Sequence, residues 1–325
     1  MSDLPSAIEI HEEGPREGFQ FEKKIFPLPD RVALVNALSH TGLKQIQVAS
    51  FVSPKHVPQM VDSAELFAAI EKVPGVKHTG LWLNEKGFRQ ASAVENVDLN
   101  GTLLFYASNA FALQNNGCGA DEMRRRQDDW IQLYDGAGLA ISSVYIMTAF
   151  GCNLQGEIPI EAVTENVRWV LERFGSNGRS MPAIYLADTV GWAVPTEIER
   201  RVGAVRELAP TARIGLHLHD TRGVGPANFY AALRMGVDLF DSSVAGLGGC
   251  PFAGHIHGTA AGNICTEDVV FMAHEMGIKT GIDLDGLIDA ALLAERIIGR
   301  PLGGRIMHSG SLRQFREAAS FEKHA

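Results

Sequence analysis

Short apolar runs and longer amphipathic segments alternate along almost the whole chain, and this alternation limits the possible fold more than any other feature. It is typical of parallel strands joined by crossover helices. After the first run, for example, Val32, Leu34, Val35 and Leu38 recur at helical spacing. The expected strands cover residues 7–11, 45–51, 78–83, 101–107, 140–147, 183–186, 213–219 and 239–244.

These strand–helix units follow one another without a Ser/Pro-rich linker or a break in composition. Eight such units predict a closed (β/α)8 TIM barrel of the α/β class. An open doubly wound sheet fits less well, because no Gly-x-Gly-x-x-Gly follows the first strand. We therefore predict a single catalytic domain over residues 1–325, with the barrel at about 7–280 and additional C-terminal helices and a tail at 281–325.

Charge and cysteine content narrow the class of protein. The chain has 29 Lys and Arg against 38 Asp and Glu, a net charge of -9, and no basic block. A nucleic-acid or membrane partner is therefore not expected. We expect a small-molecule substrate instead. The 4 cysteines form no C-x-x-C pair, which predicts free thiols in a reducing compartment. No apolar stretch reaches the length of a membrane span, so we expect a soluble, cytoplasmic protein.

Two histidines separated by one residue, His217 and His219, lie in an apolar, strand-like run. Alternation along a strand places both imidazoles on the same face. If the strand lines a barrel, both face the lumen near the carboxyl end, where active sites of such barrels lie. The pair alone is compatible with a metal chelate and equally with two hydrogen-bonded histidines of a half-buried strand.

Other reactive side chains also fall where expected strands end. Arg16 and Glu17 follow the first strand, Gln47 lies on the second, and Asp188 follows the sixth. A glycine-rich run containing Cys250 follows the eighth strand, and its backbone freedom suits a mobile lid that carries one thiol. The sequence therefore predicts a reactive centre at the carboxyl ends of the strands.

Several motifs occur in a consistent order: GPREGFQ at 14–20, SFVSPK at 50–55, HLHDT at 217–221, GLGGCPFA at 246–253, and GN at 262–263 followed by TED at 266–268. In these motifs the sequence resembles the 3-hydroxy-3-methylglutaryl-CoA lyase family, metal-dependent TIM-barrel lyases, as a divergent member. The glycine–cysteine run is the most specific of them.

The resemblance implies a divalent metal cation, Mg²⁺ or Mn²⁺, held by Glu17, His217, His219 and Asn263. It also implies a carbon–carbon lyase that cleaves a 3-hydroxy-3-methylglutaryl-CoA-like 3-hydroxyacyl-CoA to acetyl-CoA, or another short acyl-CoA, plus a keto acid. A homodimer is implied as well. The family's oligomeric state and substrate thus stand as expectations for this chain.

The resemblance also implies roles for individual side chains. Arg16 would stabilise enolate charge on the thioester oxygen, and Cys250 would give a proton to the enolate carbon. Glu17, His217 and Asp188 complete the predicted catalytic set. The predicted contacts with the acyl-CoA substrate are Gln20, Lys23, Gln47, Gly248 and Gly249.

Two positions depart from the family's pattern. The family has aspartate where this chain has Glu17, and a strand-two glutamate where this chain has Gln47. Gln47 carries no charge, so it could orient Arg16 or substrate only through hydrogen bonds. A second His-x-His, His255 and His257, lies in a loop longer than the family's, either as a solvated loop tip or as a contact to substrate or metal.

Two other functions remain open on the sequence. An aldolase or Claisen-type condensing enzyme acting on a 2-oxo acid would share the strand-seven histidines, although the glycine–cysteine run argues against it. A barrel that binds acyl-CoA without turnover would account for Glu17 and Gln47. Metal content distinguishes these functions, because a binding module would melt identically with and without a chelator.

Overall fold

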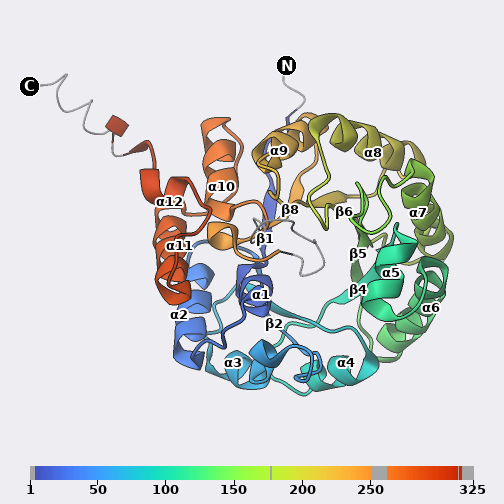
Figure 1. The fold of residues 1–325 in the computed structure, drawn as a ribbon, viewed down its shortest axis with the longest axis horizontal. Coiled ribbons are helices and arrows are strands. Elements are labelled where there is room, and N and C mark those ends of the chain that lie inside the picture. The colour runs from blue at the N-terminus through green and yellow to red at the C-terminus, as the bar shows by residue number, and fades with distance from the viewer. Residues whose placement is uncertain (1–3, 176–177, 250–261, 314, 317–325) are drawn as a thin grey trace, which may run out of the picture.

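The structure is a computed structural model that describes residues 4–175, 178–249, 262–313 and 315–316. Eight parallel strands form one curled sheet inside a ring of helices (Figure 1). The strands are β1 (Glu9–Glu12), β2 (Gln45–Ser50), β3 (Lys77–Leu81), β4 (Gly101–Tyr106), β5 (Ile141–Met147), β6 (Ala183–Ala187), β7 (Ile214–His217) and β8 (Leu239–Ser242).

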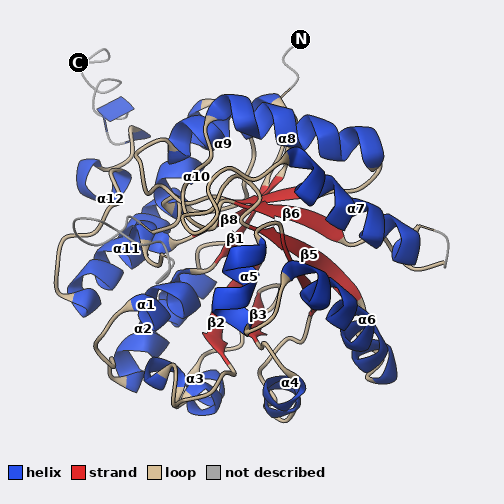
Figure 2. Cartoon of the chain, turned by 45° about the vertical axis from the view of Figure 1, so that its right-hand side comes forward, coloured by secondary structure: helices blue, strands red, loops and turns tan. Residues whose placement is uncertain are grey.

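The helices of the described residues surround the strands, and most of them lie outside the sheet, as Figure 2 shows. They are α1 (Phe19–Phe21), α2 (Leu28–Ser39), α3 (Ser63–Ala69), α4 (Glu85–Ser92), α5 (Asn109–Asn116), α6 (Ala120–Gly136), α7 (Ile160–Phe174), α8 (Pro195–Leu208), α9 (Gly225–Arg234), α10 (Thr266–Glu275), α11 (Leu284–Ile298) and α12 (Ile306–Ser309), with short helical turns η1 (Gly14–Gly18), η2 (Pro58–Met60) and η3 (Val244–Gly246). The expected TIM barrel is confirmed, and α11 and α12 are the additional C-terminal helices.

The strand order is β3-β2-β1-β8-β7-β6-β5-β4. β1 pairs with both β2 and β8, so the first and last strands of the chain are neighbours and the sheet curls toward closure. β3 and β4 stand at the two ends of this order, and no strand ladder joins them in the described part of the chain.

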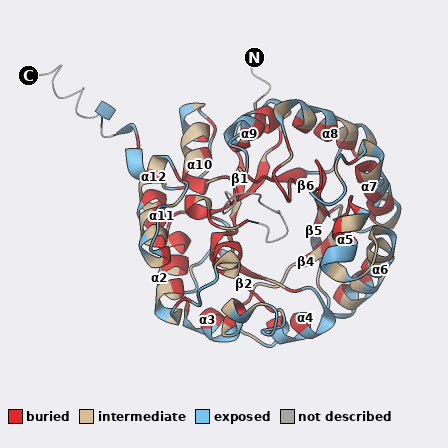
Figure 3. Ribbon diagram, in the orientation of Figure 1, coloured by how far each residue is buried: buried red, intermediate tan, exposed pale blue. Residues whose placement is uncertain are grey.

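The core lies between the sheet and the helices. Leu216 on β7 and Phe240 on β8 are 0% exposed, and the helix surfaces that face the strands are buried while the outer ones are exposed (Figure 3). Polar side chains fix the starts of some helices: Asn84 accepts a hydrogen bond from the backbone N–H of Gly87 at the start of α4. Within the described ranges, no helix is long and apolar enough to cross a membrane.

The seventh strand is shorter than the sequence predicted. β7 ends at His217, whereas we expected it to reach His219. The β6 and β8 ladders both end at His217. Beyond it the backbone pairs with a segment that follows β8, through an isolated antiparallel bridge between His219 and Asn263 and a 3.0 Å hydrogen bond from Ile264 N to Leu218 O. This bridge brings two predicted metal ligands together.

Candidate active site and metal centre

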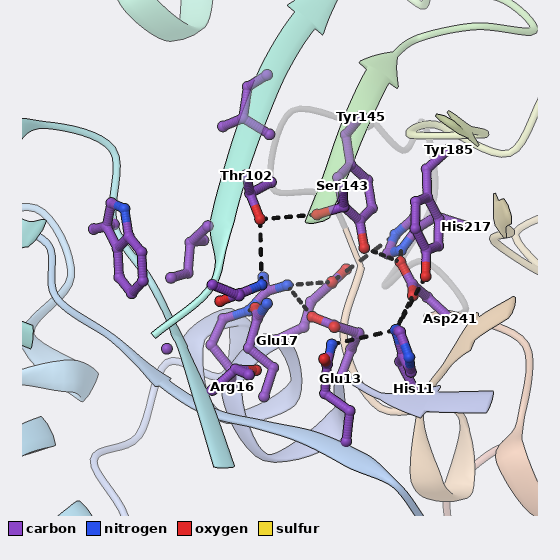
Figure 4. Close-up of a pocket in the computed structure, with 18 of the residues that line it drawn as sticks. His11, Glu13, Arg16, Glu17, Thr102, Ser143, Tyr145, Tyr185, His217 and Asp241 are labelled. Atoms are coloured by element: carbon purple, nitrogen blue, oxygen red, sulfur yellow. Dashed lines mark hydrogen bonds and ion pairs between the residues drawn. The ribbon is translucent and has the colours of Figure 1, made fainter. Parts of the chain in front are cut away.

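A cavity of about 1150 Å³ lies inside the barrel. Side chains at the carboxyl ends of the strands line its upper part, and Glu13, Arg16, Glu17 and His217 are directed into it (Figure 4). The predicted reactive centre therefore coincides with a real cavity at the strand ends, as barrel geometry requires.

Glu17, His217 and His219 form one buried cluster, in which the possible ligand atoms all lie within 4.8 Å of one another. His217 Nε2 and His219 Nε2 are 3.3 Å apart, and Glu17 Oε1 is 3.3 Å from His219 Nε2. Glu17 lies on η1, a π-helical turn immediately after β1. Such turns place side chains at functional sites more often than regular helices do.

Asn263 borders this cluster. Its side-chain amide donates to Ser243 Oγ at 2.8 Å, while its Oδ1 is buried and has no hydrogen-bond partner among the described residues. Gly248 packs against both Glu17 and Asn263: a Cβ there would lie 2.9 Å from Glu17 Cγ and 3.1 Å from Asn263 Nδ2. With a φ of +101°, this position also has a backbone that only glycine adopts without strain.

These residues fit a divalent cation. Two imidazole nitrogens, a carboxylate and an amide oxygen form a donor set that suits a divalent cation. A buried amide oxygen without a partner costs about 1–3 kcal/mol, and a cation would remove that cost for Asn263. Burial raises the pKa of Glu17, but Arg16 and the two histidines outweigh it and hold the pKa well below its ordinary value, so Glu17 is ionised.

Asp241 on β8 supports His217 and was not predicted from the sequence. Its Oδ2 is 3.1 Å from His217 Nδ1 and accepts a 2.9 Å hydrogen bond from the hydroxyl of Tyr145. A carboxylate on the second ring nitrogen of a ligating histidine fixes the ring and leaves Nε2 free for the metal. An inward-facing Asp in the apolar run of the eighth strand was the available sequence signal.

Arg16 is held by three side chains. Its Nη2 is 2.6 Å from Glu13 Oε2 and 3.2 Å from Glu17 Oε2, and its Nε donates to Gln47 Oε1. Gln47 therefore orients Arg16 through a hydrogen bond, and the second carboxylate comes from Glu13, which the sequence analysis did not single out. The neighbouring Glu12 has a structural role. Its Oε1 accepts hydrogen bonds from the backbone N–H groups of Gly14 and Val244, which link η1 to the segment after β8.

Asp188 follows β6 and is 1% exposed. Its Oδ1 accepts hydrogen bonds from the backbone of Trp192 and Ala193, and its Oδ2 has no partner among the described residues. Burial raises the pKa of Asp188 to about 6, although the charge of His219 opposes this shift. The next residue, Thr189, lines the cavity, whereas Asp188 itself does not.

Of the remaining residues predicted to contact the acyl-CoA substrate, some line the cavity and others do not. Gln20 and Gly249 line the cavity, and Gln20 accepts a hydrogen bond from Ser50 Oγ. Lys23 is exposed in the turn after α1 and does not line the cavity. Cys250 lies outside the described residues, as do His255 and His257.

Metal binding is expected to strengthen as pH rises. Burial lowers the pKa of His217, but the hydrogen bond to Asp241 and the charge of Glu17 outweigh it and raise the pKa to about 9. A ligating imidazole must be neutral, so below this pKa the metal displaces a proton. Mn²⁺ affinity measured by calorimetry should therefore rise about tenfold between about pH 7 and about pH 8. A pH-independent affinity would show that His217 is not a ligand.

Comparison with known proteins agrees with this geometry. The HMGL-like family model matches residues 7–293. The chain is 37% identical to the mitochondrial hydroxymethylglutaryl-CoA lyase of Bos taurus, over 94% of this chain and 90% of the relative. It is 35% identical to the cytoplasmic 3-hydroxy-3-methylglutaryl-CoA lyase of Mus musculus, over 94% of this chain and 85% of the relative.

Solved structures agree as well. The crystal structure of hydroxymethylglutaryl-CoA lyase from Pseudomonas aeruginosa matches with a TM-score of 0.85 and 35% identity, covering 94% of this chain and 98% of that one. An HMG-CoA lyase from A. baumannii in complex with coenzyme A and 3-methylmalate matches with a TM-score of 0.83 and 33% identity, over 95% of this chain and 96% of that one. On the family match and these relatives, the chain belongs to the HMGL-like family, which includes the carbon–carbon lyases named hydroxymethylglutaryl-CoA lyase.

Proposed function

We propose that this chain is a divalent-metal-dependent lyase that breaks the C2–C3 bond of 3-hydroxy-3-methylglutaryl-CoA or a close analogue. The products are acetyl-CoA, or another short acyl-CoA, and a keto acid. The observation that carries the proposal is the buried cluster of Glu17, His217 and His219 beside Arg16, at the carboxyl end of the barrel. The names of the relatives supply the substrate class.

The metal is proposed to be Mg²⁺ or Mn²⁺, with Glu17, His217, His219 and Asn263 as its protein ligands. Such a cation would supply Lewis-acid polarisation of the substrate's oxygen atoms. The donor set supports this assignment, as does the Oδ1 of Asn263, which has no hydrogen-bond partner among the described residues. Asp241 holds the His217 ring from the other side.

Arg16 is proposed to hold the charge that develops on the thioester oxygen when the C2–C3 bond breaks. Its guanidinium is fixed by Glu13 and Gln47, so little reorganisation is needed as that charge forms. We assign to Asp188 the proton that leaves the tertiary hydroxyl, because its buried carboxyl interacts with the charge of His219 and its Oδ2 has no partner among the described residues. Asp188 itself does not line the cavity, so the proton would reach it through a group that does. The electrons of the broken bond pass into the acyl-CoA enolate, and the hydroxyl carbon becomes the ketone of the second product.

Cys250 is proposed to give the proton that converts the enolate carbon to the methyl group of acetyl-CoA. The two residues before it support this role: Gly248 packs against Glu17 and Asn263, and Gly249 lines the cavity. Gln20, Gln47, Gly248 and Gly249 are proposed contacts for the acyl-CoA, and Lys23 a contact for the outer part of coenzyme A. The relative from A. baumannii that contains coenzyme A supports an acyl-CoA ligand.

An activity assay tests the proposed function. The purified chain is incubated with Mg²⁺ or Mn²⁺ and 3-hydroxy-3-methylglutaryl-CoA, and acetyl-CoA and acetoacetate are measured. Equimolar formation of both products supports the lyase. Consumption of acetyl-CoA with a 2-oxo acid would instead identify a condensing enzyme, and tight binding without either reaction would identify a binding module.

The contacts of Arg16 lead to a separate prediction. Glu13→Gln removes the carboxylate that fixes Arg16, and kcat is expected to fall about 10–100-fold with little change in KM. Placing a carboxylate on the other side of the guanidinium, in the double variant Glu13→Gln/Gln47→Glu, should recover most of the loss. Steady-state kinetics of the three proteins measures this. Equal kcat in the single and double variants would mean that Glu13 does not act through Arg16.

A cytoplasmic location is also proposed. It is supported by the mouse relative named cytoplasmic, although the bovine relative is named mitochondrial. The homodimer remains a prediction from the sequence.

A further inference from the structure

The cavity that holds the metal cluster continues through the barrel to the amino-terminal ends of the strands. On β3, the alternate residues Lys77, Thr79 and Leu81 all line it, from the first residue of the strand to the last. On β6 the lining begins at the first residue, Ala183, and on β8 it begins at the first residue, Leu239. Because one face of a strand carries every second residue, the whole inward face of β3 borders this space.

Polar side chains stand in the middle of the barrel, where branched apolar residues normally fill a TIM barrel. Thr102 Oγ1 lies 2.9 Å from Ser143 Oγ, and these two side chains face the same space as Tyr145 (Figure 4). Gln45, Thr102 and Tyr145 are only partly buried although they line the inside of the sheet. The interior is therefore hollow and accessible to solvent.

Two lysines give the amino-terminal end of the cavity a positive charge. The acidic side chains at this end are already paired within the protein, Glu9 with Arg213 at 2.7 Å and Asp98 with Lys72. Lys44 and Lys77 are exposed and have no ion-pair partner among the described residues. A 2.9 Å hydrogen bond from Lys77 N to Lys44 O holds the two residues next to each other. A mouth with this charge attracts small anions.

The chemistry of the substrate places the keto acid deeper in the barrel than the acetyl-CoA. In the proposed reaction the C2–C3 bond breaks, and the fragment beyond C2 is farther from coenzyme A than the acetyl group is. Coenzyme A is proposed to reach the cavity from the carboxyl-terminal face, past Gln20 and Gly249. Acetyl-CoA that is still bound therefore occupies the way back to that face.

We propose that the barrel interior is an exit passage, through which the keto acid leaves at the amino-terminal face while acetyl-CoA is still bound. The inference rests on the proposed lyase function and adds a route for its second product. The polar middle of the barrel keeps a small carboxylate solvated along this route, and Lys44 and Lys77 attract it at the mouth.

A bulky side chain at the amino-terminal end tests the passage. Ala183 lines the cavity roughly 13 Å along β6 from Ala187, the residue that pairs with His217, so Ala183→Trp obstructs the interior away from the metal cluster. Total acetyl-CoA, bound and free, is followed after rapid mixing with 3-hydroxy-3-methylglutaryl-CoA and quenching. We expect a burst of about one acetyl-CoA per chain at the rate of the unaltered protein, followed by a steady state at least about tenfold slower than that of the unaltered protein.

Thr211→Trp is the matched control, because Thr211 is exposed at the same end of the barrel and does not line the cavity. It should leave both phases unchanged. A folded Ala183→Trp variant with an unchanged steady-state rate would overturn the passage. An equal fall in the burst rate would overturn it too, since the substitution would then act on bond cleavage. If the unaltered protein forms no acetyl-CoA, the lyase function itself is wrong.

Charge reversal at the mouth is a second test that leaves the barrel interior unchanged. In Lys44→Glu/Lys77→Glu both altered side chains are exposed, so this variant should fold even if Ala183→Trp does not. Its steady-state rate should be about threefold lower or less at low salt, and the difference should shrink in about 1 M salt, where the Debye length is about 3 Å. Lys279→Glu, at an exposed lysine outside the cavity, is the control. Equal rates in the two variants would overturn the proposed route.

Discussion

Replacing His217 or His219 with alanine is expected to abolish turnover and to weaken metal binding by at least about 100-fold. Removing a residue that hydrogen-bonds to a metal ligand typically lowers metal affinity about 10–100-fold, and removing the ligand itself should lower it at least as much. Both side chains lie in the buried cluster with Glu17. The barrel should remain folded, since neither ring belongs to the apolar layer between sheet and helices. Metal content by elemental analysis, activity and melting temperature measure the three effects.

Two controls accompany these variants. Asp241→Asn keeps both ligands but changes the partner of His217, and a smaller loss of about 10–100-fold in metal affinity is expected. His40→Ala removes an exposed histidine outside the cavity and should change nothing. If both His217→Ala and His219→Ala kept the metal content of the unaltered protein, the proposed metal centre would be wrong.

Arg16→Lys is expected to lower kcat about 10²–10³-fold while changing KM much less, because a planar fork that contacts three side chains becomes a single ammonium. Lysine cannot contact Glu13, Gln47 and Glu17 in the same geometry. Steady-state kinetics with 3-hydroxy-3-methylglutaryl-CoA measures the effect. Arg179→Lys, which alters a bidentate surface pair with Asp135, serves as the matched substitution and should leave kcat unchanged.

Near-normal turnover in Arg16→Lys would mean that a point charge suffices at this position. Arg16 would then only balance the buried carboxylates Glu13 and Glu17. The melting temperature would still fall in that case, because replacing Arg16 leaves the buried carboxylates less well compensated.

The sequence predicted the order of the strands along the chain well, because apolar runs and helical spacing are local properties. It could not predict that no strand ladder joins β3 and β4 in the described part of the chain, since periodicity carries no information about which strands pair.

The residues of the site also divide into those that the sequence identifies and those that only the structure identifies. His217, His219 and Arg16 could be chosen from the sequence because spacing and motif identify them. Glu13 and Asp241 could not, because their roles depend on side-chain contacts with Arg16 and His217 that only the folded structure shows. A carboxyl group in a strand has many possible roles, and only the buried contact decides among them.

Titration of the metal-free protein with Mn²⁺ tests the central claim most directly. Bound ions per chain and the rate of acetyl-CoA formation from 3-hydroxy-3-methylglutaryl-CoA are followed in the same samples. The account predicts no activity after chelation and a rate that rises in proportion to occupancy, saturating at about one ion per chain. Full acetyl-CoA formation by the chelated protein would contradict it.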